Sequence, residues 1–186
     1  MSTVRILKRN LVAENSKFDI YFDHVLDSSG HEVPNYLVVA PKQKSENLVT
    51  GVGILPIREN KIGLIRIYRP ALCDYSWEIP HGFVEFGESD QTAAMRELME
   101  ETGLNVEQVT SLGLMTPDTG VLAGRVHLYL AEQCMQTNLS EGELGLQQLA
   151  FFTIDEFENM IITSEIQDSF TLSAWCRYLL LRKTHV

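Results

Sequence analysis

Residues 82–104 read GFVEFGESDQTAAMRELMEETGL, and the middle of this stretch has several independent marks of a helix. Ser89 or Asp90 can cap the N-terminus, because their side-chain oxygens accept hydrogen bonds from the first backbone N–H groups. Gly103 stands where a left-handed C-terminal cap belongs. The alanine, methionine and leucine residues in between favour the helical backbone. We therefore predict a helix that begins at residue 89 or 90 and ends before Gly103.

Three glutamates of this predicted helix share one face. Glu97, Glu100 and Glu101 are spaced i, i+3 and i+4, which places their Cβ atoms ~5–6 Å apart. Three like charges at this spacing repel each other. A hard divalent cation such as Mg²⁺ would offset the repulsion, because it prefers oxygen ligands and keeps water molecules next to substrate phosphates. Taken alone, the same glutamates also fit a solvated acidic helix face.

The wider spacing favours the metal site. The stretch fits the pattern G-x5-E-x7-R-E-U-x-E-E-x-G-U, where U is aliphatic, at all nine specified positions. This pattern is the Nudix box, and nine matches at fixed spacing are far more specific than a single glycine-rich loop. The chain therefore resembles the Nudix hydrolases, which implies metal-assisted hydrolysis of a diphosphate linked to another group. The matching residues are Gly82, Glu88, Arg96, Glu97, Leu98, Glu100, Glu101, Gly103 and Leu104.

Composition limits the class of protein. The 186 residues are 45% hydrophobic and 22% charged, which suits one well-cored globular domain with a small appendage. The net charge of −10 argues against a nucleic-acid partner, since that affinity depends on Lys and Arg neutralising phosphates. No apolar run approaches the ~20 residues of a membrane helix. Residues 1–18 are too polar for a signal peptide. We expect a cytoplasmic protein with neither a nucleic-acid nor a membrane partner.

The cysteines agree with this expectation. They are odd in number, widely spaced and without a CxxC pair: Cys73, Cys134 and Cys176. This arrangement suggests neither a disulfide framework nor a zinc site. We interpret them as buried thiols of a cytoplasmic protein.

The first part of the chain is β-rich. Strands are predicted at residues 4–7, 18–26 and 36–40. Three strands are too few to close a core, so this sheet must pack on something else. We assign residues 1–45 to an N-terminal β-rich dimerisation subdomain and residues 46–186 to a Nudix hydrolase domain. In the branch of the family that this chain resembles, such a sheet packs across a partner subunit, which implies a homodimer.

The rest of the chain alternates strands with helices. Apolar β-rich runs lie at residues 49–55, 61–68, 109–115, 126–131 and 149–152. Besides the box helix, helices are predicted at residues 154–162 and 164–183. This order predicts an α/β fold, a Nudix α/β/α sandwich with a mixed sheet and a small N-terminal β-sheet subdomain. The box helix would cover one face of the sheet and the C-terminal helix the other.

The flanks of the box narrow the resemblance to the ADP-ribose and nucleotide-sugar pyrophosphatases. Similar segments are RIYRP at 66–70, WEIPHG at 77–82 and TPDTG at 116–120. His81 departs from this branch, which usually has alanine before the box glycine; its backbone carbonyl could still ligate a metal ion, which would make its side chain incidental. Asn35, Tyr36 and Pro117 depart from the ADP-ribose members in particular, so GDP-mannose and other nucleoside diphosphate sugars stay open as substrates.

The resemblance implies roles for the acidic box residues. Glu97 and Glu101, one helical turn apart, are the first candidate metal ligands, with Glu100 on their flank. The backbone carbonyl of His81 is a further candidate ligand. We expect Mg²⁺ as the cofactor, with Mn²⁺ as a substitute. The alternative role for these glutamates is a structural ion pair with lysine or arginine.

Two arginines are candidate substrate-binding residues. Arg69 could grip the diphosphate or the adjoining sugar, because a cation is needed beside the leaving group; the alternative is a surface arginine at a strand end. Glu78 could bind substrate or a metal-bound water, or have a structural role. Arg96 is interpreted first as an anchor paired with Glu88, since a planar guanidinium suits such bracing, and second as a substrate contact. We interpret His127 as a sheet residue rather than a catalyst.

By resemblance, the general base lies on a mobile loop after the core strands. Here that loop is SEGELG at residues 140–145. Counting back from the strand at 151–152 favours Glu143 as the base, with Glu141 second and Glu100 of the box as the remaining catalytic candidate. The two glycines of the loop would let it close over the substrate. A plain acidic surface loop is the alternative.

These features predict an Mg²⁺-dependent pyrophosphatase that hydrolyses ADP-ribose or a related nucleoside diphosphate sugar to a nucleoside monophosphate and a sugar phosphate. One alternative is a non-catalytic Nudix-fold regulator that binds such a ligand, although the intact glutamates speak against it. Another is a Nudix hydrolase for a different nucleotide such as GDP-mannose. An mRNA-decapping or mutagenic-nucleotide-cleaning enzyme shares the box, but the flanks do not support it and the net charge is wrong for RNA.

Overall fold

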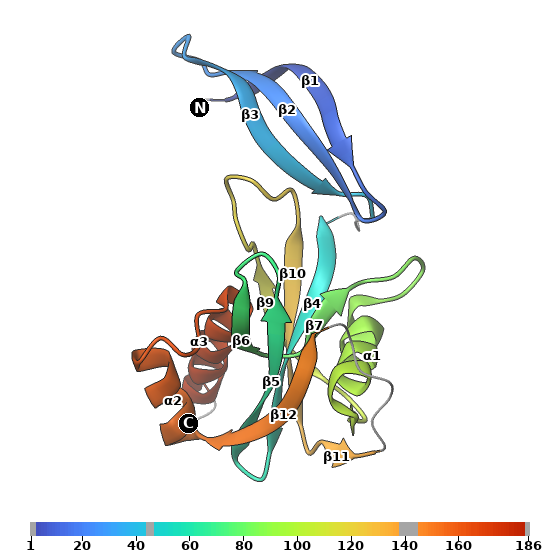
Figure 1. Cartoon of the computed structure of the whole chain (residues 1–186), viewed down its shortest axis with the longest axis vertical. Coiled ribbons are helices and arrows are strands. Elements are labelled where there is room, and N and C mark those ends of the chain that lie inside the picture. The colour runs from blue at the N-terminus through green and yellow to red at the C-terminus, as the bar shows by residue number, and fades with distance from the viewer. Residues whose placement is uncertain (1–2, 44–46, 138–144, 185–186) are drawn as a thin grey trace. The chain divides into compact units, whose positions relative to one another are not determined.

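A computed structural model of the chain describes residues 3–43, 47–137 and 145–184. The chain divides into two compact units (Figure 1). The first unit contains residues 1–50 and 116–125, and the second contains residues 51–115 and 126–186. In the described part of the chain, no helix is both long and apolar enough to cross a membrane.

The first unit is built on a three-stranded antiparallel sheet. Its strands are β1 (Arg5–Glu14), β2 (Phe18–Leu26) and β3 (Glu32–Pro41), in the order β1-β2-β3. The predicted turn between the last two strands is present, with Asp27 Oδ1 accepting hydrogen bonds from the backbone N–H groups of Ser29 and His31. The first strand is longer than the predicted residues 4–7. Most side chains of β1 are exposed, so this strand buries little of its apolar surface within the unit.

A segment distant in sequence completes the first unit. The backbone N–H of Val39 donates to Val121 O at 2.8 Å, and the N–H of Ala123 donates to Val39 O at 2.9 Å. Val39 and Leu122 form a parallel β-bridge. Residues 121–123 therefore pair with β3 at one point, a long-range pairing that local sequence patterns do not reveal.

The second unit is organised around a seven-stranded sheet. Five strands follow the order β12-β5-β4-β10-β9, with β6 paired to β5 and β7 paired to β4. The strands are β4 (Val49–Arg58), β5 (Lys61–Arg69), β6 (Asp74–Glu78), β7 (His81–Phe83), β9 (Thr110–Met115), β10 (Arg125–Glu132) and β12 (Leu146–Thr153). A separate two-stranded pair joins β8 (Leu104–Asn105) to β11 (Met135–Gln136).

The large sheet is mixed, as predicted. The pairings β12–β5, β5–β6, β4–β5, β4–β7 and β9–β10 are antiparallel. In contrast, β4 and β10 run in the same direction. A Cβ on Gly51 would approach Val126 and one on Gly53 would approach Leu128, so residue numbers increase in the same direction along both strands. One parallel pair in an otherwise antiparallel sheet gives the mixed topology.

Helix α1 (Asp90–Thr102) has the predicted bounds because both of its ends are capped locally. Ser89 Oγ accepts a hydrogen bond from the Thr92 N–H at 3.1 Å. Gly103 has a φ of 67°, in the left-handed region, and its N–H donates to Met99 O. A glycine tolerates this conformation without the steric cost that a Cβ brings.

The two C-terminal helices follow β12 directly. Helix α2 (Ile154–Ile162) begins with a capping box in which Thr153 and Glu156 exchange hydrogen bonds. Helix α3 (Ser169–Thr184) begins five residues later than the predicted residue 164. Asp168 explains the difference, because its carboxylate accepts a hydrogen bond from the Thr171 N–H at 2.7 Å, as an N-cap does. The residues before it form a turn at the end of α2 instead.

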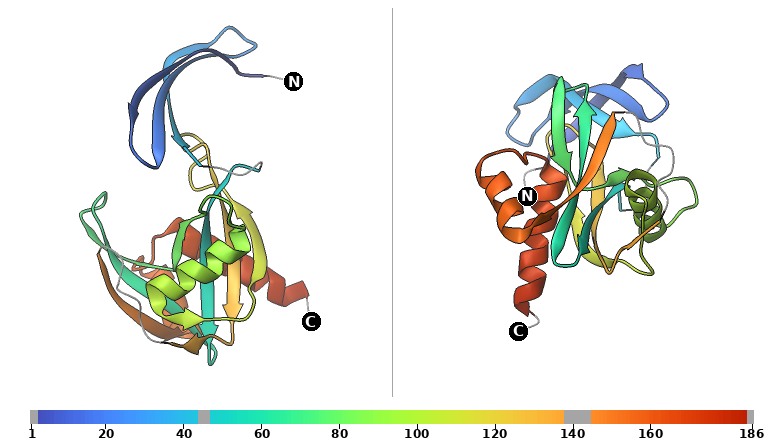
Figure 2. Two further views of the ribbon diagram at one scale, coloured as in Figure 1. Left: turned by 90° about the vertical axis from the view of Figure 1, so that its right-hand side faces the viewer. Right: turned by 60° about the horizontal axis from the view of Figure 1, so that its bottom comes forward.

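Helices cover both faces of the large sheet (Figure 2). On one face, Ala93, Ala94 and Leu98 of α1 pack in a cluster with Val52 and Ile54 of β4. On the other face, α2 and α3 pack against the sheet through Phe157, Trp175 and Tyr178, together with Leu55, Leu64 and Leu128. Since neighbouring residues of a strand point to opposite faces, β4 supplies both cores. The predicted α/β/α sandwich is confirmed.

Candidate active site

The Nudix box forms the strand β7, the loop after it and helix α1. Gly82 lies in β7 opposite Val52 of β4. A Cβ on Gly82 would lie 2.1–2.4 Å from the carboxyl atoms of Glu97. Because Gly82 has no side chain, the Glu97 carboxylate can pack directly against the strand. Gly51 has a similar role, because a Cβ there would lie 2.8 Å from the carbonyl oxygen of Gly82.

Arg96 braces the loop against the helix. Its Nε and Nη2 donate to the Glu88 carboxylate at 3.1 and 3.0 Å, and Nη2 also donates to Phe83 O at 2.9 Å. Its Nη1 donates to Glu97 at 2.8 Å and to Glu100 at 3.0 Å. The hydrogen bonds from Arg96 lower the pKa of Glu88. The carboxylates of Glu88, Glu97 and Glu100 in turn raise the pKa of Arg96. The structure thus places Arg96 on the box itself, in the arrangement of the predicted anchor.

Glu101 lies at the inner side of the helix and is 2% exposed. Its Oε2 accepts a hydrogen bond from the backbone N–H of His81 at 2.8 Å. This bond joins the middle of the site to the start of β7. A carboxylate that is buried at such a depth is costly unless charge or hydrogen bonds compensate it.

The donor set fits a hard divalent cation in its chemistry. Glu97, Glu100 and Glu101 offer carboxylate oxygens from one helix face, and Gly82 leaves room beside Glu97. Among the described residues, however, no group of three or more His, Cys, Asp or Glu side chains is assembled in a metal-binding arrangement. In this structure the Arg96 guanidinium contacts both Glu97 and Glu100.

A second group of side chains lies next to Glu101, at the ends of β5 and β6. Arg69 donates to both oxygens of Glu78, with Nη2 at 2.6 Å from Oε2. Burial of the Glu78 carboxyl favours its protonated form, but hydrogen bonds and nearby positive charge, with the hydrogen bonds from Arg69 the largest of these, outweigh burial and lower the Glu78 pKa. The same Arg69 Nη2 lies 2.9 Å from His81 Nε2. His81 therefore connects the predicted diphosphate-binding arginine to Glu101, one of the predicted metal-binding carboxylates.

The His81 side chain is a feature that sequence reasoning missed. The sequence predicts an incidental side chain, yet its two ring nitrogens contact Ile79 O and Arg69, and its ring meets Phe170 edge-to-face. The sequence does contain a signal for this role: at position 81 the usual alanine is replaced by histidine, whose ring has two hydrogen-bonding nitrogens. The two loop candidates for the general base, Glu141 and Glu143, lie outside the described residues.

His127 belongs to a separate hydrogen-bonded group at the edge of the sheet. Its Nδ1 contacts Asp90 in the first turn of α1, and its Nε2 lies 2.7 Å from Ser111 Oγ on β9. The Tyr129 ring lies beside it on β10, with ring centroids 4.3 Å apart. These contacts fasten the N-terminus of α1 to two strands, which agrees with the interpretation of His127 as a sheet residue.

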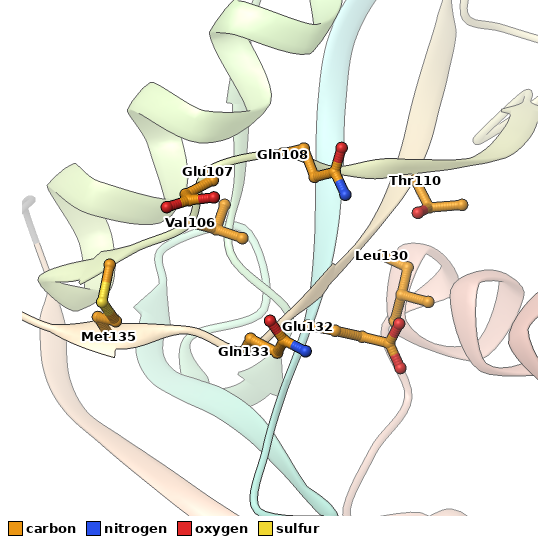
Figure 3. Close-up of a pocket in the computed structure, with 8 residues that line it drawn as sticks. All are labelled: Val106, Glu107, Gln108, Thr110, Leu130, Glu132, Gln133 and Met135. Atoms are coloured by element: carbon orange, nitrogen blue, oxygen red, sulfur yellow. The ribbon is translucent and has the colours of Figure 1, made fainter.

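A cavity of about 260 Å³ lies elsewhere in the second unit (Figure 3). It is lined by Val106, Glu107, Gln108, Thr110, Leu130, Glu132, Gln133 and Met135. Its only charged lining residues, among those described, are the two glutamates. A diphosphate would be repelled by these two charges without a cation between them, so this cavity does not suit an anionic substrate.

Both the sandwich and the loop-to-helix unit are those of a Nudix hydrolase, an enzyme that acts on pyrophosphate bonds. The family model of the NUDIX domain matches residues 47–175, and the chain belongs to this family. Nudix hydrolases generally use a divalent metal ion.

Two curated relatives and one solved structure illustrate the similarity. The methanol dehydrogenase activator of Bacillus methanolicus is 35% identical over 130 residues, which cover 67% of this chain and 68% of the activator. The ADP-ribose pyrophosphatase of Bacillus subtilis (strain 168) is 26% identical over 184 residues, covering 96% of this chain and 94% of that protein. The solved structure of an ADP compounds hydrolase has a TM-score of 0.80 at 19% identity, covering 98% of this chain and 95% of the other. This last likeness shows a shared fold.

Proposed function

We propose that this enzyme hydrolyses the diphosphate of ADP-ribose or a related nucleoside diphosphate sugar, releasing a nucleoside monophosphate and a sugar phosphate, with Mg²⁺ as its cofactor. The observation that carries the proposal is the continuity of the site. Arg69 supplies a cation for phosphate oxygens, and His81 connects it to the carboxylate of Glu101. Both phosphates of a diphosphate carry negative charge, and both need positive charge beside them. The names of the pyrophosphatase relative and of the structural neighbour agree with this substrate class.

Each residue of the site has a proposed role. Glu97 and Glu101 would hold the metal ion, with Glu100 and the carbonyl of His81 as further ligands. The bound ion would supply positive charge to the phosphate oxygens and help to activate a water molecule. Arg69 would bind the diphosphate, and buried Glu78 would hold Arg69 in place. These roles assign substrate binding to the strand ends and metal binding to the helix.

The direct test is a hydrolysis assay with a panel of nucleotide sugars. ADP-ribose, GDP-mannose and UDP-glucose would be incubated with the enzyme in Mg²⁺, in Mn²⁺ and in excess EDTA, and phosphate release from the products by a phosphatase would be measured. We expect Mg²⁺-dependent cleavage, greatest for an ADP-linked sugar. Adding 8-oxo-dGTP to the panel separates a nucleotide-cleaning activity. Cleavage of GDP-mannose but not of ADP-ribose would show that the substrate is a GDP-linked sugar.

A second candidate function is regulation of a partner enzyme. It is favoured by one observation, the 35% identity to a protein named as a methanol dehydrogenase activator. A non-catalytic regulator would bind a nucleotide sugar without cleaving it. Equilibrium binding of ADP-ribose without any product in the hydrolysis assay would support this function over the first. Turnover that is lost in EDTA would count against it.

We further propose that the enzyme is a homodimer that buries the sheet of the first unit. The support is the exposure of its apolar side chains, with Ile6 and Leu11 both 54% exposed. A cavity of about 510 Å³ on this unit is lined largely by valine, isoleucine and tyrosine side chains around the Arg9–Asp23 ion pair. Exposed apolar surface of this kind marks a site of association.

A further inference from the structure

We propose that the imidazole of His81 is a positioning residue that holds the Arg69 guanidinium in the orientation needed for the diphosphate. This inference rests on the proposed function, because it assigns Arg69 to the substrate. It concerns only the His81 side chain, whereas the predicted metal ligand is the backbone carbonyl of the same residue.

The hydrogen-bond partners of His81 define one tautomer. Ile79 O, 3.0 Å from Nδ1, can only accept, so Nδ1 carries the proton and donates it. The guanidinium of Arg69 has donors only, so Nε2, 2.9 Å from Arg69 Nη2, must be the acceptor. An imidazole ring with the proton on Nδ1 satisfies both contacts, and Nε2 also lies 3.7 Å from Glu78 Oε2. The carbonyl of Ile79 therefore directs the lone pair of Nε2 toward Arg69.

The ring itself is held in place from the other side. Its centroid lies 5.0 Å from that of Phe170 on α3, with the two planes at 86°, a favourable edge-to-face arrangement. The backbone N–H of His81 is bound by Glu101, and its side chain is only 18% exposed. An acceptor that is fixed in this way selects one orientation of its donor.

Arg69 is consequently held by two acceptors of different character. Glu78 accepts from it through two carboxylate oxygens, while His81 contacts Nη2 through a ring nitrogen. A second carboxylate at the position of His81 would repel a diphosphate, whereas a neutral nitrogen does not. The Arg69 side chain remains 30% exposed, so its guanidinium is held from within and accessible from outside. An alanine at position 81, as in the resembling branch, would leave out the acceptor that His81 contributes.

The test compares two matched substitutions. His81→Phe keeps an aromatic ring against Phe170 but has no acceptor for Arg69. His81→Gln loses the ring but can place an amide oxygen near the position of Nε2. Both keep the backbone carbonyl. Each variant would be measured with ADP-ribose and Mg²⁺, alone and combined with Arg69→Ala, and thermal denaturation would confirm that each is folded. If His81→Phe does not fold, His81→Ala replaces it.

We expect His81→Phe to raise KM about 2- to 10-fold, as for one lost hydrogen bond, with kcat changed less than about twofold. His81→Gln should recover at least part of the loss. In the Arg69→Ala background, His81→Phe should have no further effect, because the residue through which it acts is absent. A fall in kcat at unchanged KM, or an equal effect with and without Arg69, would overturn the proposal.

A spectroscopic measurement keeps this inference separable from the proposed function. Long-range ¹H–¹⁵N correlation spectra of the wild-type enzyme report which nitrogen of His81 is protonated, and need no substrate. We expect the proton on Nδ1 in the wild type. In Arg69→Ala the Nε2 signal should shift, because the contact between Nε2 and Arg69 is lost. A proton on Nε2 would overturn the proposal even if ADP-ribose is cleaved. If no nucleotide sugar is cleaved, the proposed function fails, while the spectra still decide whether His81 holds Arg69.

Discussion

Gly82 shows how a single missing side chain shapes the site. A methyl group at this position would overlap the Glu97 carboxylate, which is the mobile end of a flexible side chain and can move away. We therefore expect Gly82→Ala to lower kcat/KM about 10- to 100-fold by displacing Glu97, the proposed metal ligand, while Tm changes little. The check is a kinetic assay over a range of Mg²⁺ concentrations. The double variant with Glu97→Gln should be no worse than Glu97→Gln alone, and additive losses would contradict a shared mechanism.

The general base is a second residue-scale prediction. Glu143→Gln should lower kcat about 10²- to 10⁴-fold with little change in stability, as for the loss of a proton acceptor. Glu141→Gln, two residues away on the same segment, is the matched control and should retain most of the activity. Single-turnover kinetics would measure both. Unchanged turnover in Glu143→Gln would move the role to Glu141 or back to Glu100 in the box.

Sequence alone predicts which residues form the candidate site, but not the contacts among them. The box spacing is local, and it located the glutamates of α1, their cap and their anchor within one stretch. The pairing of Arg69 with Glu78 could not be predicted in the same way, because it depends on the register between β5 and β6. The role of the His81 ring depends further on α3, which is about ninety residues away and supplies Phe170.

At the scale of elements, the loop between β7 and α1 is fastened by Glu88. Hydrogen bonds from Arg96 hold the Glu88 pKa below its ordinary value of 4.5. Stability from this group is therefore fully present above about pH 4.5 and is lost as the pH falls through the lowered pKa. We expect Glu88→Gln to be less stable than wild type at pH 7, with the difference shrinking below pH 4.5. Denaturant unfolding at several pH values would measure this, with exposed Glu107→Gln as the control; a difference that grows on acidification would contradict it.

The edge strand β9 is held by one side chain of α3. Arg177 donates from Nη1 to Leu112 O at 2.9 Å and from Nη2 to Leu114 O at 2.6 Å, on either side of Gly113. Arg177→Met should cost about 1–3 kcal/mol, since these carbonyls would lose charged donors. That loss corresponds to a fall in Tm of about 2–12 °C for a chain of this size. Exposed Lys183→Met on the same helix is the control, and an equal effect of both changes would argue against a specific clamp.

The sequence predicts the bounds of helices α1 and α2 as the structure has them, but not the start of α3 or the place of residues 116–125. Helix α2 and helix α1 carry their own caps, so their bounds follow from a few neighbouring residues. The start of α3 was placed too early because the apolar pattern extends into a turn that Asp168 ends. The membership of residues 116–125 in the first unit depends on hydrogen bonds to Val39, which lies about eighty residues earlier.

At the scale of the whole molecule, the sheet of the first unit leaves apolar side chains exposed. Ile6 is half exposed on β1 and lines the apolar cavity of that unit. If a second copy of the chain covers this surface, a charge at that position should prevent association, because an unpaired carboxylate would have to be buried in the interface. We therefore expect the wild type to sediment as a dimer and Ile6→Glu to sediment as a monomer, with a circular dichroism spectrum like that of the wild type. Ile162→Glu is the control, since Ile162 is 80% exposed on α2 in the second unit and should leave the dimer intact. A wild type that is monomeric at every accessible concentration would contradict the dimer itself, and a dimeric Ile6→Glu would assign the interface to another surface.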